Sequence, residues 1–235
     1  MRIPIHREGW PFIGFFFAAN VLLFLVSSWI GWAFVPLTIW CIAFFRDPER
    51  ITPLGEGLIT SPADGRLLPV CQAVPPSELG MGSEPRVRLS IFMNVFDVHV
   101  NRVPLDGTVV ALSYRKGLFF NASFDKASEH NERMSIRIRI EGMQDAEDLA
   151  VVQIAGLVAR RIKCDLIQGQ HVRRGERFGI IRFGSRLDVY LPPGAQVLAA
   201  SDQRVKAGET VLARLQRWSS DGHDSRKADP KTVGL

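Results

Sequence analysis

Cysteine is scarce in this sequence of 235 residues. The three cysteines, Cys41, Cys71 and Cys164, lie far apart and form no CxxC pair. This excludes a disulfide framework and a cysteine-type zinc site, and it is consistent with a reducing compartment. The histidines show no metal-ligand spacing, so we expect no metal ion. A basic and aromatic stripe is also lacking, and we therefore expect no nucleic-acid partner.

Charge is absent from one long stretch, Gly9–Phe45, which holds 37 residues without Asp, Glu, Lys, Arg or His but four of the five Trp and eight of the fifteen Phe. One membrane span needs about 20 residues, and a signal peptide has a shorter apolar region followed by a small-residue cleavage site. We therefore predict that residues 1–46 form a membrane-associating hydrophobic hairpin, spanning or re-entrant, in which Pro11–Val26 and Trp29–Phe45 are joined at two serines. The alternative is a buried helical hairpin packed on a soluble domain.

Basic residues flank this hairpin on both sides, with Arg2 and Arg7 before it and Arg46 and Arg50 after it. A hairpin places both flanks on one side of the membrane, and the positive-inside tendency makes that side cytoplasmic. The net charge of +5 suits an anionic membrane surface. We expect the protein at the cytoplasmic face of the cell membrane, with no candidate site residue inside the hairpin.

In the chain after the hairpin, apolar and polar residues alternate as they do in short β-strands. Apolar residues alternate in Arg86–His99 and in Ser135–Ile140, and Gly and Pro punctuate the chain between such segments. We predict a mainly β fold, a barrel or sandwich of short strands over residues 47–218, followed by a disordered polar tail over 219–235. Further predicted strands are Gly107–Tyr114, Leu149–Ala155, Arg177–Phe183, Arg186–Leu191 and Thr210–Leu215.

Four polar motifs stand out: SPADGR, DVHVNRVP, FDKASEHNER and FGSRLDVYLP, beginning at Ser61, Asp97, Phe124 and Phe183. In the last motif Gly184-Ser185 interrupts what would otherwise be one strand from Ile180 to Leu191. A glycine there indicates a β-bulge or a close backbone approach. The alternative is a reactive serine held in a strained backbone.

Taken together, SPADG, DVHVNR-x-P, DKASE-x-NER and FGSR-x-DVYLP resemble the phosphatidylserine decarboxylase family, in its short (archaeal-type) form. The resemblance runs from about Thr52 to Ala213. The hydrophobic hairpin also fits this pyruvoyl-dependent family, and FGSR-x-DVYLP is long enough to be specific.

The resemblance implies a proenzyme that cuts itself between Gly184 and Ser185. Attack of Ser185 Oγ on the Gly184 carbonyl gives an ester, elimination releases the upstream chain, and the resulting dehydroalanine hydrolyses to a pyruvoyl group. The products would be a β chain, residues 1–184, and an α chain, residues 185–235, in a heterodimer that could oligomerise further. The pyruvoyl group would form a Schiff base with phosphatidylserine, and the reaction would release carbon dioxide and phosphatidylethanolamine.

The resemblance also nominates His99 and Asp64 as catalytic helpers. Longer family members carry a second histidine three residues after the first, usually assigned as the base, and Arg102 stands there in this chain. The base for self-cleavage is therefore left open. We expect His99 to matter more for turnover than for cleavage, as a proton donor or as a partner of Arg102 in binding the substrate carboxylate.

Each of these residues has a structural alternative. Asp64 precedes a glycine, as is common in turns, and His99 suits a half-buried strand position. We interpret Glu129, Glu132 and Arg133 as a solvated charged face.

Two other classes of protein share parts of this pattern. A membrane-anchored serine peptidase with a Ser-Lys dyad also combines a hairpin with a β-rich domain, although its serine would be expected soon after the hairpin. A non-enzymatic membrane-bound β module would need neither Gly184-Ser185 nor DVHVNR. Whether the purified protein is one polypeptide or two separates all three.

Overall fold

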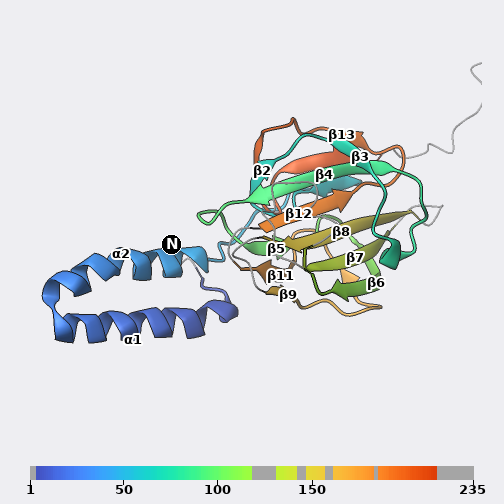
Figure 1. Ribbon diagram of the computed structural model, residues 1–235. Helices are drawn as coiled ribbons and strands as arrows, with labels where there is room; N and C mark the ends of the chain where they lie inside the picture. The colour runs from blue at the N-terminus through green and yellow to red at the C-terminus, as the bar shows by residue number, and fades with distance from the viewer. Residues whose placement is uncertain (1–3, 118–130, 142–146, 157–160, 183–184, 216–235) are drawn as a thin grey trace, which may run out of the picture.

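Two antiparallel helices extend away from a β domain and touch it only at their root (Figure 1). The computed structural model describes residues 4–117, 131–141, 147–156, 161–182 and 185–215, so the predicted tail over 219–235 lies outside the described residues. The structure confirms the predicted fold class, a mainly β domain preceded by an apolar helical hairpin.

The hairpin consists of α1 (Trp10–Val26) and α2 (Ser28–Phe44), preceded by the short 3-10 helix η1 (Arg7–Gly9). Ser27 alone separates the helices, in extended conformation, at the predicted turn. The two helices approach each other closely at Gly31. A Cβ on this residue would lie 2.4 Å from the ring of Phe24 on α1, so a larger residue would not fit there. With η1, α1 forms a helix of 20 residues that is long and apolar enough to cross a membrane, judged by length and composition.

The root of the hairpin is buried against the β domain. Cys41, Phe44 and Phe45 form one apolar cluster with Val98, Val100 and Ile180. Phe44 and Phe45 are 1% and 0% exposed. The last turn of α2 is thus part of the packing that surrounds the segment from Val98 to Val100.

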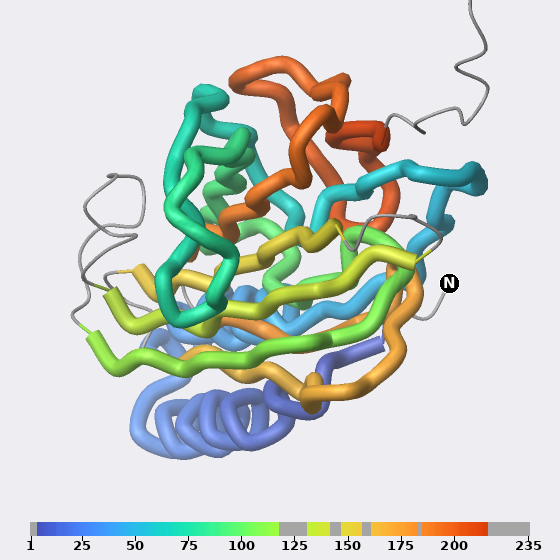
Figure 2. Tube along the Cα trace, turned by 90° about the vertical axis from the view of Figure 1, so that its right-hand side faces the viewer, coloured from blue at the N-terminus to red at the C-terminus, as the bar shows by residue number. Residues whose placement is uncertain are grey.

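The described strands of the β domain form one large sheet and two small ones. The large sheet has the order β10-β6-β7-β8-β12-β4-β2-β14, and β3 also pairs with β4; Figure 2 shows β6, β7 and β8 side by side. The small sheets are β5-β11-β9 and β1-β15-β13. The strands are β1 (Leu58–Thr60), β2 (Gly65–Leu67), β3 (Cys71–Ala73), β4 (Arg86–Met93), β5 (Val100–Arg102), β6 (Gly107–Arg115), β7 (Arg133–Ile140), β8 (Asp148–Ala155), β9 (Ile162–Cys164), β10 (His171–Val172), β11 (Arg177–Ile181), β12 (Ser185–Tyr190), β13 (Gln196–Val197), β14 (Arg204–Val205) and β15 (Val211–Arg214).

The main core joins the large sheet to the two small ones. Leu187 and Val189 of β12 belong to the same buried cluster as Ile59 of β1 and Phe178 of β11. The short 3-10 helix η2 (Ser77–Leu79) packs on the opposite face of the large sheet. Its Leu79 belongs there to a second buried apolar cluster, together with Val152 of β8 and Tyr190 of β12. Alternate residues of β12 therefore face two different interiors, and both faces of this strand are buried.

Gly65 fits where a larger residue does not, because a Cβ there would lie 2.2 Å from the carbonyl oxygen of Phe92 on β4. We expect Gly65→Ala to lower the free energy of unfolding by about 3 kcal/mol, since this contact is with backbone that cannot move aside. The measurement is denaturant unfolding in detergent. Gly194→Ala is the control: its Cβ would meet no atom within 4 Å at φ +74°, and about 1 kcal/mol is expected. Equal losses in the two variants would contradict the steric explanation.

Candidate active site

Ser185 is the first residue of β12, the strand that lies between β4 and β8 in the large sheet. It pairs with Met93 on β4 and with Ala155 on β8. Its side chain is fully buried, and its Oγ lies 3.9 Å from the Met93 sulfur. Gly184, the other half of the predicted cleavage site, lies outside the described residues.

The chain changes sheets just before Ser185. The strand β11 ends at Ile181 in the small sheet, and β12 begins at Ser185 in the large sheet. The predicted interruption of a strand from Ile180 to Leu191 therefore coincides with the passage between two sheets. This passage places Ser185 at a strand end, beside the small sheet that carries the DVHVNR motif.

The rest of the FGSR-x-DVYLP motif anchors β12 from its other face. Arg186 donates to both carboxylate oxygens of Asp188, at 2.6 and 2.9 Å, and also to Ser90 Oγ on β4 at 3.0 Å. Arg186 is 1% exposed and Asp188 is fully buried. Such bidentate pairs are geometrically specific. Arg186 and Asp188 thus hold the strand whose first residue is Ser185.

His99 lies immediately before β5, and it is fully buried rather than half-buried. Its Nδ1 is 3.0 Å from the carbonyl oxygen of Asp97. A carbonyl can only accept, so Nδ1 carries the proton and Nε2 of the neutral ring is an acceptor. Nε2 has no hydrogen-bond partner among the described residues. The His99 carbonyl in turn accepts from the backbone N–H of Ile181, the last residue of β11.

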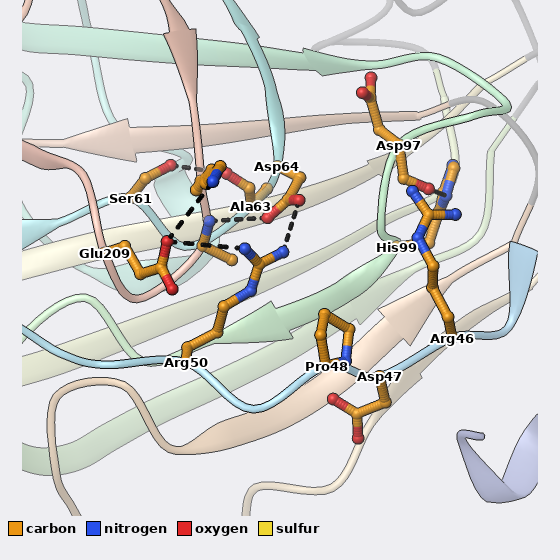
Figure 3. Close-up of polar contacts among 12 residues, drawn as sticks. Arg46, Asp47, Pro48, Arg50, Ser61, Ala63, Asp64, Asp97, His99 and Glu209 are labelled. Atoms are coloured by element: carbon orange, nitrogen blue, oxygen red, sulfur yellow. Dashed lines mark hydrogen bonds and ion pairs between the residues drawn. The ribbon is translucent and has the colours of Figure 1, made fainter. Parts of the chain in front are cut away.

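The hairpin forms one side of the His99 environment. The ring of Phe44 lies 4.3 Å from the imidazole, centroid to centroid, at an angle of 34°. Burial lowers the pKa of His99 to about 4; Asp97 acts in the opposite direction and Arg46 adds to the lowering. His99 is therefore neutral at physiological pH. Figure 3 shows Arg46 beside His99 and Asp97.

Two amides complete a buried polar group that the sequence analysis missed. Gln153 Nε2 donates to Asn101 Oδ1 at 2.8 Å, and Asn101 Nδ2 lies 3.8 Å from the same Met93 sulfur that Ser185 approaches. Gln153 Oε1 is buried without a partner among the described residues. The sequence held a signal for Gln153, since it is the only polar residue in Leu149–Ala155.

Asp64 is held in a separate cluster (Figure 3). Its carboxylate accepts from Arg50 at 2.7 Å and from the backbone N–H of Ala207 at 2.8 Å. Burial raises the pKa of Asp64, and these two hydrogen bonds oppose that effect. The contacts of Asp64 thus link the segment after the hairpin to the turn before β15.

Arg102 is also buried and is directed toward the same segment after the hairpin. It donates to the carbonyl oxygens of Gly175 and Pro48, at 2.8 and 2.9 Å, and forms an ion pair with Asp47 at 3.4 Å. Its guanidinium therefore joins β5 to the chain that leaves the hairpin.

The interpretation of Glu132 and Arg133 as a solvated face is wrong, because they are only 8% and 6% exposed. Arg133 is paired with Glu78 at 2.8 Å. Asn131 Nδ2 and the Glu132 carbonyl both bond to Ala155, the residue opposite Ser185. This part of the motif therefore fixes the end of β8 next to Ser185. Glu129 lies outside the described residues.

Comparison with known proteins identifies the family of the chain. The family described as phosphatidylserine decarboxylase matches residues 37–213. Proteins named phosphatidylserine decarboxylase proenzyme from Paramagnetospirillum magneticum and Cereibacter sphaeroides are each 58% identical over 212 residues, covering 90% of this chain and 87% and 90% of theirs. One from Ruegeria pomeroyi is 57% identical over 213 residues, covering 91% of this chain and 96% of its own. The chain belongs to the phosphatidylserine decarboxylase family.

Proposed function

We propose that this protein converts phosphatidylserine to phosphatidylethanolamine and carbon dioxide after cutting its own chain between Gly184 and Ser185. Family membership supports the reaction. The observation that carries the site assignment is the position of Ser185 at the start of β12, buried within one group with Met93 and Asn101. The two fragments stay associated because β12 is paired on both edges with strands of the upstream chain.

The surroundings of Ser185 fit a pyruvoyl group formed from it. Ser185 is fully buried, and two buried acceptors of the same region lack partners among the described residues: Oε1 of Gln153, whose amide is bonded to Asn101, and Nε2 of His99, two residues before Asn101. Buried polar atoms without partners are costly and are usually explained by a ligand or a catalytic role. Here they suit the N–H groups of the substrate amine. The ketone of a pyruvoyl group supplies an electron sink for the loss of carbon dioxide.

We assign proton transfer to His99. Its neutral Nε2 can take a proton from the substrate ammonium, and the resulting imidazolium can return one to the product carbon. The hydrogen bond from Nδ1 to Asp97 fixes the ring so that Nε2 remains available. Asp64 and Arg102 contribute as positioning residues in this proposal, since their contacts hold the segment from Asp47 to Arg50.

The hairpin serves as the membrane anchor. Large apolar side chains are exposed along both helices, and at the turn Leu25 and Trp29 are 79% and 85% exposed. A lipid substrate explains why a β domain keeps such a hairpin beside its candidate site. The basic flanks of the hairpin support a position of the β domain on the cytoplasmic face.

Ser185→Ala should remain one chain and release no carbon dioxide, because the hydroxyl that attacks the Gly184 carbonyl is missing. Intact-mass measurement of the purified variant checks this, with Ser113→Ala on β6 as a control that should still give fragments 1–184 and 185–235. A cleaved and active Ser185→Ala protein would rule out the proposal.

His99→Ala should yield mostly two-chain protein whose carbon dioxide release is lower by about 10²–10⁴-fold, the usual contribution of a positioned acid or base. In the protein with His99, the rate should persist as pH falls below 6.5 and decline only near the lowered pKa of about 4, where Nε2 becomes protonated. A gel beside a carbon dioxide assay across pH measures both effects.

His6→Ala is the control for His99, since it removes another largely buried histidine at the root of the hairpin. It should leave both cleavage and turnover close to normal. An uncleaved His99→Ala precursor would instead assign His99 as the base for Ser185.

Leu25→Asp combined with Trp29→Asp should release the protein from phospholipid vesicles, because a charge inside the bilayer costs about 2.5–3.5 kcal/mol per residue. Self-cleavage should continue. Sedimentation with vesicles in high salt is the measurement. Val74→Asp combined with Leu198→Asp, at exposed positions on the β domain, is the control that should still sediment. If both double variants sediment fully, the turn of the hairpin does not enter the membrane.

A further inference from the structure

Arg46 is the first charged residue after the charge-free stretch Gly9–Phe45. A residue at that point of a membrane hairpin lies at the level of the lipid headgroups. Its guanidinium donates to two carbonyl oxygens, to Ala43 at the end of α2 at 2.6 Å and to Phe96 at 2.7 Å. Phe96 belongs to the turn that precedes His99, so Arg46 bridges the hairpin and the site.

The charge of Arg46 is not balanced by a carboxylate among the described residues. Six other arginines near the hairpin root and the site form an ion pair with a carboxylate. These ion pairs are Arg7–Asp165, Arg50–Asp64, Arg102–Asp47, Arg177–Asp47, Arg182–Glu8 and Arg204–Asp97. Two carbonyl dipoles orient the guanidinium of Arg46 but leave its positive charge available to an anion.

The field of Arg46 reaches the site, where it lowers the pKa of His99. The charged groups that act on the imidazole are Arg46, next to α2, and Asp97, on the turn before β5. The carboxylate of Asp97 is already engaged by Arg204 at 2.9 Å and by the backbone N–H of Asn94 at 2.9 Å. Among the residues that the structure describes, Arg46 is therefore the cation beside His99 that no carboxylate balances, and an anion arriving from the membrane meets it there.

We propose that Arg46 binds the headgroup phosphate of phosphatidylserine, with the serine part of the headgroup extending toward His99 and Ser185. This assignment rests on the proposed function. A guanidinium forms paired hydrogen bonds with phosphate oxygens. The phosphodiester keeps its negative charge throughout the reaction, whereas the carboxylate is lost, so a fixed cation is suited to the phosphate. Arg102, which the sequence analysis nominated for the carboxylate, is engaged by Asp47, Pro48 and Gly175.

The product tests this assignment, because phosphatidylethanolamine retains the phosphate and lacks the carboxylate. We expect Arg46→Gln to weaken the binding of soluble dihexanoyl phosphatidylethanolamine to the cleaved protein, measured by calorimetry, by about 10–100-fold, as expected for a hydrogen bond between charged groups. KM for the matching phosphatidylserine should rise by the same factor, while kcat changes less than about threefold. For Arg46→Lys, the affinity for the product and the KM should lie between those of the unaltered protein and those of Arg46→Gln. Lysine keeps the positive charge but cannot form the paired hydrogen bonds of a guanidinium.

Arg7→Gln is the matched control: it removes the same charge from the other flank of the hairpin, where Arg7 pairs with Asp165. It should change both constants by less than about twofold. Equal effects in Arg7→Gln and Arg46→Gln would overturn the proposal in favour of general surface attraction. A raised KM with unchanged phosphatidylethanolamine affinity would overturn it in favour of the carboxylate. Failure of unaltered protein to release carbon dioxide would refute the proposed function, yet the calorimetric comparison would still test Arg46.

Discussion

The pairing of β12 with β4 on one edge and β8 on the other is the constraint on which the candidate site depends. Antiparallel pairing runs from Ser185 to Tyr190 on both sides. A slip of one residue would turn every side chain to the opposite face. Ser185 and Leu187 would leave the main core, and Arg186 and Asp188 would enter it. The contacts of Arg186 and Asp188 with β4 oppose such a slip, because Arg186 donates to Ser90 Oγ and Asp188 pairs with Arg88 on the face covered by η2. The polar residues of FGSR-x-DVYLP thus specify the register that sets the position of Ser185.

Burial of His99 is the second constraint, and the hairpin contributes to it. Taking an imidazole out of water disfavours its charged form, which explains a neutral ring with an available Nε2 at physiological pH. Phe44 packs on part of that ring, and Phe44 itself belongs to the buried apolar cluster that contains Phe45 and Val100. The hairpin holds no acid or base, yet its last turn helps to set the protonation state of the site. The anchor and the site therefore cannot be separated at residue 46 without exposing buried apolar surface on both.

The longer strands could be predicted from alternation, whereas strands of two or three residues such as β5, β9 and β14 could not, because their partners define them. The structural alternative for His99, a half-buried strand position, is wrong because the histidine is fully buried and lies outside β4, although alternation predicts a strand over the whole of Arg86–His99. In the structure β4 ends at Met93, and a turn follows in which Asp97 accepts from the backbone of Asn94. The motif alone nominates Ser185, and that assignment stays a prediction. The grouping of Asn101 with Gln153 depends on sheets that only the folded chain brings together, and so does the burial of Arg133 against Glu78.

The segment between the hairpin and the β domain is clamped rather than flexible. Arg46 is bonded to the carbonyl of Phe96, Asp47 to Arg102 and Arg177, and Arg50 to Asp64. Each of these contacts reaches a different part of the β domain, so together they fix its orientation relative to the helices. Figure 3 shows the contact of Arg50 with Asp64. Under the proposed function, in which the hairpin is the membrane anchor, its orientation defines where the membrane surface lies with respect to His99. A lipid headgroup can then meet a site that is already arranged, and little ordering remains to be paid for on binding. The same reasoning accounts for the polar residues of the Arg46–Arg50 segment, since a simple tether to the membrane would need none of these partners.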